Sequence, residues 1–184
     1  SLDLIRRLRE RGAGVRCILT AGGAHFVTPL SLVALSEDTV FTDLFSLTTE
    51  SEMGHIRLSR EADLIVVAPA SADLMAKMAH GRADDLASTA LLATDKPVLI
   101  APAMNVMMWA NPATQANLAL LKARGIHVVG PGSGDLACGE EGSGRLSEPH
   151  DILDAMDRLL KVERVLSGVK ALVSSGPTHE PIDP

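Results

Sequence analysis

Two short apolar segments of this chain run into the same tripeptide, Ala-Pro-Ala. Residues 65–67 (Ile-Val-Val) lead into 68–70, and residues 98–100 (Val-Leu-Ile) lead into 101–103. Each tripeptide is followed by a polar turn and then by a segment that reads as a helix. Fully apolar strands that feed helices are typical of a parallel sheet covered on both faces. Because ligands bind such sheets at the carboxyl ends of the strands, the two Ala-Pro-Ala turns mark the expected binding edge.

The rest of the chain alternates between helix and strand patterns, which predicts one α/β domain with a doubly wound parallel sheet. We expect a glycine-rich loop over 130–144, and a helix that starts at Thr49 with capping-box spacing to Glu52. The other predicted helices cover 2–11, 28–35, 72–80, 85–92, 111–124 and 150–161, and the other predicted strands cover 15–19, 39–42, 64–67, 98–100, 126–129 and 171–173.

Composition excludes several classes of function. The net charge is −6 and the basic residues are dispersed, which argues against nucleic-acid binding. No run of about eighteen apolar residues is present, so we expect no membrane span. The two cysteines, Cys17 and Cys138, are not expected to pair, which favours a reducing compartment, and we expect a cytoplasmic protein.

Two strand-to-helix turns could hold an anion. Ser71 is a natural N-cap, and the N–H groups of the helix that it starts form an anion site or belong to an ordinary cap. The turn at 20–23 (Thr-Ala-Gly-Gly) has small residues that let a ligand approach the backbone. Two such turns on one edge favour a phosphate-bearing ligand.

Cys138 and the histidines are the candidates for acid–base chemistry. Cys138 lies among glycines and charged residues, and an unperturbed thiol with a pKa of ~8.5 is a usable acid near neutrality. A buried structural thiol is the alternative, but its neighbours favour a functional role. Spacing alone does not distinguish His55 from His25 or His80, and a lone histidine is more often a surface or core residue than a catalytic one.

The methionines at 104, 107 and 108 either pack in the core or form an adaptable pocket wall. No spacing typical of a metal site is present, because the His and Cys residues are scattered, and we expect no metal. Residues 132–137 match a dinucleotide-binding pattern in form only, since no helix is predicted to follow them.

Four motifs, in order, resemble those of the homo-oligomeric flavin-containing cysteine decarboxylase family. Residues 69–73 (Pro-Ala-Ser-Ala-Asp) resemble its PASAN motif, and residues 102–109 match its PxMNxxMW motif in full. Residues 53–56 (Met-Gly-His-Ile) look like its active-site histidine segment. Residues 137–145 are similar to its substrate-recognition flap.

The resemblance implies a flavodoxin-like, three-layer fold, bound FMN, and decarboxylation of 4′-phosphopantothenoylcysteine to 4′-phosphopantetheine. Direct loss of CO₂ from a cysteine carboxylate would leave an unstabilised carbanion, whereas prior oxidation of the thiol to a thioaldehyde supplies an electron sink. By analogy with the family, His55 acts as base or positions the thiol, Asn105 binds the substrate carboxylate or amide, and Cys138 donates a proton in the final reduction.

The resemblance also implies the residues that bind the ligands. Asp73 stands where many family members have Asn, and a carboxylate cannot donate the hydrogen bonds of an amide, so its backbone N–H is the expected contact. The residues implied to line FMN are Thr20, Gly22, Ser71, Ala72, Asp73, Leu74 and Ala103. Those implied to bind the substrate are Asn105, Met107, Arg60 and Gly139.

The tail at 175–184 resembles the opening of phosphopantothenoylcysteine synthetases. We therefore expect an FMN-binding decarboxylase domain over 1–166, lacking its N-terminal strand and flavin loop, and a linker with the start of a truncated ligase domain over 167–184. Mg²⁺ and a nucleoside triphosphate, CTP by resemblance, would serve only that ligase domain. Family members form trimers, so we expect a trimer or a multiple of trimers.

Three other functions compete with this hypothesis. A flavodoxin-type electron carrier usually stacks Tyr or Trp on its flavin, but this chain has no Tyr and one Trp. A non-catalytic regulatory flavoprotein of the same family would lack the active His or Cys, and both are present. A peptidyl-cysteine decarboxylase is the nearest enzymatic alternative. The synthetase-like tail favours decarboxylation of 4′-phosphopantothenoylcysteine, a step toward coenzyme A, over that alternative.

Overall fold

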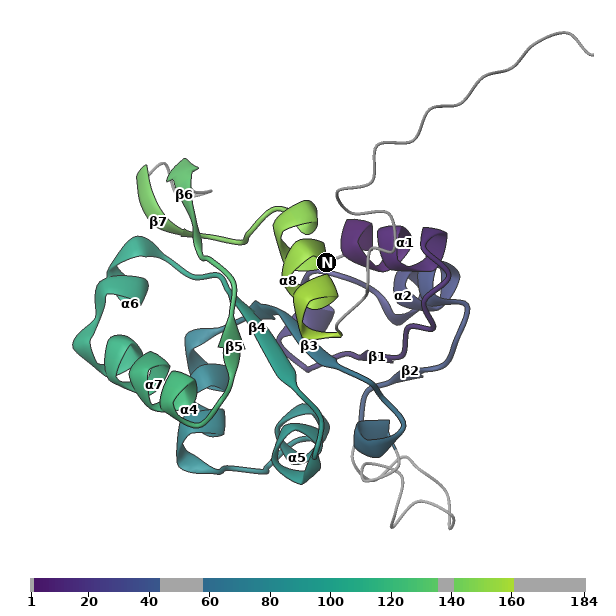
Figure 1. Ribbon diagram of the computed structural model, residues 1–184, viewed down its shortest axis with the longest axis horizontal. Helices are drawn as coiled ribbons and strands as arrows, with labels where there is room; N and C mark the ends of the chain where they lie inside the picture. The colour runs from purple at the N-terminus through teal and green to yellow at the C-terminus, as the bar shows by residue number, and fades with distance from the viewer. Residues whose placement is uncertain (1, 44–57, 136–140, 161–184) are drawn as a thin grey trace, which may run out of the picture.

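The computed structural model describes residues 2–43, 58–135 and 141–160 (Figure 1). The predicted helix from Thr49 and the predicted strand at 171–173 lie outside these ranges. The described helices are α1 (Leu2–Glu10), η1 (Gly23–His25), α2 (Pro29–Ser36), α4 (Ala72–His80), α5 (Leu86–Ala93), α6 (Val106–Ala110), α7 (Pro112–Ala123) and α8 (Pro149–Leu159). The described strands are β1 (Cys17–Ile18), β2 (Val40–Phe41), β3 (Ile65–Ala70), β4 (Val98–Pro102), β5 (His127–Val128), β6 (Gly132–Asp135) and β7 (Glu141–Arg145).

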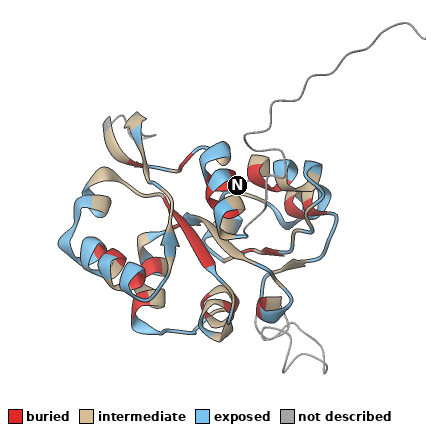
Figure 2. Cartoon of the chain, viewed as in Figure 1, coloured by how far each residue is buried: buried red, intermediate tan, exposed pale blue. Residues whose placement is uncertain are grey.

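Strands β3, β4 and β5 form a parallel sheet with β4 in the middle, and β1 pairs with β2 in parallel. The predicted parallel α/β architecture is confirmed. Every residue of β4 is buried, as the red strand in Figure 2 shows. A strand covered on both faces is continuously apolar, which explains why 98–102 carries no polar side chain.

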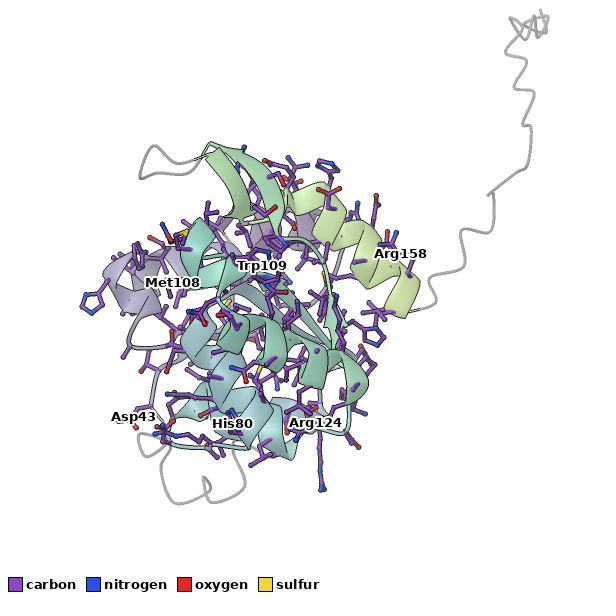
Figure 3. The ribbon with its side chains drawn as sticks, turned by 90° about the vertical axis from the view of Figure 1, so that its left-hand side faces the viewer. Asp43, His80, Met108, Trp109, Arg124 and Arg158 are labelled. Atoms are coloured by element: carbon purple, nitrogen blue, oxygen red, sulfur yellow. The ribbon has the colours of Figure 1, made fainter. Side chains whose placement is uncertain are left out.

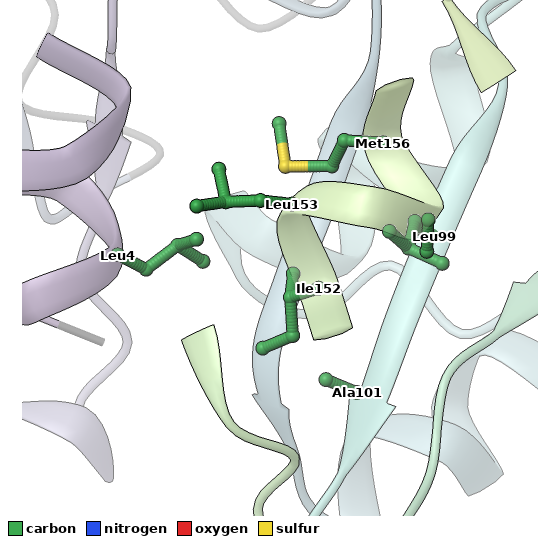
Figure 4. Packing of buried hydrophobic residues seen from close by; sticks show 7 residues of the cluster. Leu4, Leu99, Ala101, Ile152, Leu153 and Met156 are labelled. Atoms are coloured by element: carbon green, nitrogen blue, oxygen red, sulfur yellow. The ribbon is translucent and has the colours of Figure 1, made fainter. Parts of the chain in front are cut away.

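The side chains of β4 alternate between two cores, because successive residues of a strand point to opposite faces. Leu99 and Ala101 pack with α1 and α8, where Leu4 and Leu153 meet them (Figure 4). Val98 and Ile100 pack on the other face, in a cluster with Met75, Ala79, Leu118 and Leu121 of α4 and α7. The two helical layers therefore hold the strand that ends at the predicted binding edge.

Strands β3 and β4 extend further than the sequence predicted. Strand β3 runs through Pro69 to Ala70, and β4 includes Pro102. The register shifts after Val67, so that Ala70 comes opposite Pro102. Proline has no N–H to donate to a ladder, which is why regular pairing is interrupted at these tripeptides.

The glycine-rich segment differs from the prediction of a loop. Its two flanks, β6 and β7, form an antiparallel hairpin in which Ser133 lies opposite Ser143. The hydroxyl oxygens of these two serines are 3.0 Å apart, within hydrogen-bonding distance. A glycine weakens a strand only slightly, and the pairing of β6 with β7 outweighs that effect here.

Within the described residues, no helix is long and apolar enough to cross a membrane.

A cluster of charges joins α4 to the start of α5. The half-buried ammonium of Lys77 lies 2.9 Å from a carboxylate oxygen of Asp84 and 2.8 Å from one of Asp85. The hydrogen bond from Lys77 lowers the pKa of Asp84. Burial acts to raise the pKa of Asp85, but hydrogen bonds from Lys77 and Ser88 outweigh it and leave that pKa below its usual value.

This cluster predicts acid-sensitive stability. At a pH above 3.8, the ordinary pKa of an aspartate, carboxyl groups whose pKa is lowered by folding stabilise the folded state. That stabilisation is lost as the pH falls through the lowered pKa values. We expect Lys77→Met to lower the Tm at neutral pH and to shrink the Tm difference between neutral pH and pH below 3.8. Lys122→Met, at an exposed position of α7, is the control and should leave the difference unchanged. An unchanged difference in Lys77→Met would contradict the prediction.

Candidate functional site

The two Ala-Pro-Ala turns meet at one edge of the sheet. The Ala103 N–H donates to the Ala70 carbonyl oxygen at 3.1 Å, directly beyond the ends of β3 and β4. Helix α4 begins after the first turn and α6 after the second. The predicted binding edge therefore contains two helix N-termini side by side, where unpaired N–H groups gather.

Ser71 caps α4, as the sequence predicted. Its hydroxyl oxygen accepts from the N–H of Leu74 at 3.2 Å. The N–H groups of Ala72 and Asp73, in the first turn of α4, have no intrahelical partner, because no helical carbonyl precedes them. Such groups, with the positive end of the helix dipole, suit a phosphate or another electron-rich edge.

Asp73 turns its side chain away from this edge. Its carboxylate lies 3.6 Å from the Lys77 ammonium one turn along α4, and its side chain is 77% exposed. The carboxylate therefore takes part in the charge cluster of α4.

The turn after β1 has the open backbone expected of a contact with a ligand. The Thr20 hydroxyl accepts from the Gly23 N–H at 3.1 Å, which holds the turn closed. Gly22 is exposed, and a Cβ built on it would meet no heavy atom within 4 Å. A bulky group can thus approach the Gly22 backbone directly.

Asn105 caps α6, a role that the sequence analysis did not predict. Its Oδ1 accepts from the N–H of Met107 at 2.8 Å and from that of Met108 at 3.4 Å. Asparagine is among the preferred N-cap residues, so the signal was present in the sequence. The cap fixes the carboxamide at the start of α6, beside the Ala103–Ala70 contact.

The hairpin reaches this same segment. The Met104 N–H donates to the Gly144 carbonyl oxygen of β7 at 2.9 Å. Strand β7 therefore lies next to the Asn105 turn, and in the sequence it follows the segment that contains Cys138. Cys138, Gly139 and His55 themselves lie outside the described residues.

The methionines at 104, 107 and 108 do not all have the same environment: one packs in the core and two lie on the surface. Met104 and Trp109 pack against the α4–α7 core. Met107 is 70% exposed and Met108 is 49% exposed, so these two lie on the surface of α6. The apolar surface of α6 is therefore available to a ligand or a neighbouring subunit.

The remaining candidates are spread over the surface. Arg60 is exposed, and none of the described residues forms an ion pair with it. His25 is exposed in η1. His80 ends α4, at the opposite end of that helix from Ser71, and Figure 3 places it with Arg124, away from Met108 and Trp109. His80 is therefore not part of the binding edge.

A family model described as Flavoprotein matches residues 1–161. The chain belongs to the flavoprotein family. Among curated proteins, this flavoprotein is 46% identical over 184 residues to the coenzyme A biosynthesis bifunctional protein CoaBC of Haemophilus influenzae, covering 100% of this chain and 46% of that protein. It is also 46% identical over 182 residues to CoaBC of Escherichia coli, covering 99% of this chain and 45% of that protein. The chain thus spans less than half the length of these relatives.

Solved structures resemble the flavoprotein closely in fold. A cysteine-to-serine variant of a PPC decarboxylase, complexed with pantothenoylaminoethenethiol, has a TM-score of 0.77 and 34% identity, covering 88% of this chain and 93% of that chain. The FMN-dependent cysteine decarboxylase SpaF has a TM-score of 0.74 and 29% identity, covering 88% and 87%. These likenesses confirm the flavodoxin-like α/β fold that the sequence predicted.

Proposed function

We propose that this flavoprotein binds FMN and decarboxylates 4′-phosphopantothenoylcysteine to 4′-phosphopantetheine, a step of coenzyme A biosynthesis. The observation that carries the proposal is the meeting of the two Ala-Pro-Ala turns through the Ala103–Ala70 hydrogen bond. This contact places the capped start of α4 beside Asn105 on one edge. The proposed cofactor site and the carboxamide proposed to bind substrate would then be adjacent, as a flavin-dependent decarboxylase requires.

The residues proposed to hold the cofactor fit FMN. Those of the Ala-Pro-Ala turns are small, the Gly22 backbone in the turn after β1 is open, and the α4 N-terminus suits an anionic or electron-rich group. When bound, FMN supplies the oxidation and later reduction of the substrate carbon that decarboxylation of a cysteine needs. The residues proposed to hold it are Thr20, Gly22, Ser71, Ala72, Asp73, Leu74 and Ala103, with Asp73 acting through its backbone.

The substrate would lie against α6. The Asn105 side chain would hold its carboxylate or neighbouring amide, and exposed Met107 would contact its apolar part. Arg60, an exposed cation, would also contact the substrate, and Gly139 would contact it from the segment between the hairpin strands. His55 would accept or position the thiol proton, and Cys138 would return a proton to carbon in the final reduction.

The substrate class is supported by two lines of similarity. The CoaBC relatives match at 46% identity over essentially the whole chain, tail included. The cysteine decarboxylase SpaF is less similar, at 29%. We therefore favour phosphopantothenoylcysteine over a peptide that ends in cysteine.

The arrangement of the whole protein is part of the proposal. Residues 1–166 would form the decarboxylase domain, and 167–184 would lead into a ligase domain that uses Mg²⁺ and CTP. The exposed apolar surface of α6 is consistent with a trimer in which the substrate lies between subunits, and Arg60 would then reach a neighbour's substrate.

Visible absorption and CO₂ release test the proposal. We expect the purified full-length protein to carry a flavin band nearly stoichiometric with protein, and to release CO₂ from phosphopantothenoylcysteine. A peptide with a C-terminal cysteine should release far less. Faster release from the peptide would favour the peptidyl-cysteine decarboxylase, and a flavin band without CO₂ from either compound would favour an electron carrier or a regulatory subunit.

A further inference from the structure

Strand β7 lies against the two residues that flank Asn105. On one side, the Gly144 carbonyl oxygen accepts from the Met104 N–H at 2.9 Å. A Cβ built on Gly144 would lie 2.3 Å from the Met104 carbonyl oxygen, closer than real side chains approach backbone. On the other side, a Cβ on Gly142 would lie 3.2 Å from both methyl groups of Val106. Two glycines of β7 therefore pack against the residues on either side of Asn105, Gly144 against the Met104 backbone and Gly142 against the Val106 side chain.

Both glycines have a backbone conformation that favours glycine. The φ angle of Gly144 is +154° and that of Gly142 is +156°. Residues other than glycine rarely adopt such φ angles. Gly144 is also buried, so an added methyl group there has no solvent into which to turn.

We infer that Gly144 is a positioning residue for Asn105, and that β7 sets where the Asn105 carboxamide meets the substrate. The inference rests on the proposed function of Asn105. Its cap on α6 fixes the carboxamide relative to its own helix. The β7 contact adds a second constraint, because it holds the Met104 backbone, next to Asn105, against the hairpin.

The expected loss of activity on Gly144→Ala follows from how close the added Cβ would come to Met104. Relief of a 2.3 Å approach requires the Met104 backbone to move by roughly 1 Å, and a misplacement of that size can cost about 10²-fold in rate. We expect Gly144→Ala to lower kcat/KM for phosphopantothenoylcysteine by about 10²-fold while retaining FMN. Gly132→Ala is the matched control in the same hairpin. Its added Cβ would lie 3.6 Å from the nearest heavy atom, the Arg145 carbonyl oxygen, so activity should remain near the wild-type level.

A double-mutant cycle tests whether Gly144 acts through Asn105. Asn105→Ser keeps an N-cap oxygen but removes the carboxamide, so it isolates the binding role from the cap. In that background, Gly144→Ala should cause little further loss, because the group that it positions is gone. A full additional loss, or wild-type activity of Gly144→Ala alone, would overturn the inference.

Hydrogen exchange on the FMN-loaded protein, without substrate, separates the inference from the proposed function. Gly144→Ala should speed the exchange of the Met104 amide and its neighbours in α6, while α4 and α7 keep wild-type exchange. Unchanged exchange at Met104 would overturn the inference whatever the enzyme's substrate proves to be. An inactive wild-type protein would instead overturn the proposed function.

A milder variant covers the case in which Gly144→Ala does not fold. Gly142→Ala meets only side-chain methyl groups, which can give way. We expect a smaller loss in the same direction, recovered in part by the added substitution Val106→Ala. If Gly142→Ala were fully active, the contact between β7 and the Asn105 turn would have no positioning role.

Discussion

Replacing Cys138 with serine is expected to stop the proposed reaction after CO₂ release. The oxidative half needs the cofactor and a base, whereas the final half needs an acid to protonate carbon. A hydroxyl is a much weaker acid than a thiol, and loss of a general acid typically costs ~10²–10⁴-fold. Addition of phosphopantothenoylcysteine should therefore release CO₂ once, bleach the flavin absorbance and leave an enethiol product on the protein.

Stopped-flow absorbance and mass spectrometry of the bound product measure this outcome. Cys17→Ala is the matched control, because Cys17 is a buried thiol of β1 and has no part in the proposed chemistry. The solved PPC decarboxylase that resembles this chain is itself a cysteine-to-serine variant complexed with pantothenoylaminoethenethiol. If Cys138→Ser made phosphopantetheine at the wild-type rate, Cys138 would not be the proton donor.

Replacing His55 with asparagine is expected to abolish the reaction at its first step. An amide cannot accept a proton near neutrality, so thiol oxidation should not begin and no CO₂ should be released. The protein should still fold and carry FMN, since the residues proposed to bind the cofactor belong to other segments. Single-turnover CO₂ release, measured beside the flavin spectrum, separates these effects.

His80→Asn is the control for this experiment. His80 is an exposed residue at the carboxyl end of α4, the far end from Ser71, so its replacement should leave CO₂ release unchanged. Normal turnover by His55→Asn would reduce His55 to a structural residue. Loss of FMN from His55→Asn would instead place His55 among the groups that hold the cofactor.

Local patterns in the sequence predicted most of the fold. The apolar run at 98–100 predicted the central strand, because a strand covered on both faces needs no polar side chain. Ser71, Asp85 and Asn111 predicted helix starts, and each of them accepts a cap hydrogen bond. These features depend on neighbouring residues only, which is why they can be read from the chain.

The parts that the sequence analysis missed depend on distant residues. Asn105 was assigned only a ligand role by resemblance, although the structure also makes it a helix cap. The hairpin was predicted as a loop because its glycines suggested one. Their spacing carried a further signal: Gly142 and Gly144 are two residues apart, so in a strand both expose backbone on one face, where another backbone can approach. Nothing local identifies Met104 as that neighbour.

The most direct measurement follows the carboxyl carbon of the substrate. The full-length, FMN-loaded protein is incubated with phosphopantothenoylcysteine that carries an isotopic label in its cysteine carboxyl group, and both products are analysed by mass spectrometry. We expect labelled CO₂ and unlabelled 4′-phosphopantetheine in equal amounts. Unchanged substrate, in the presence of bound FMN and intact fold, would contradict this expectation.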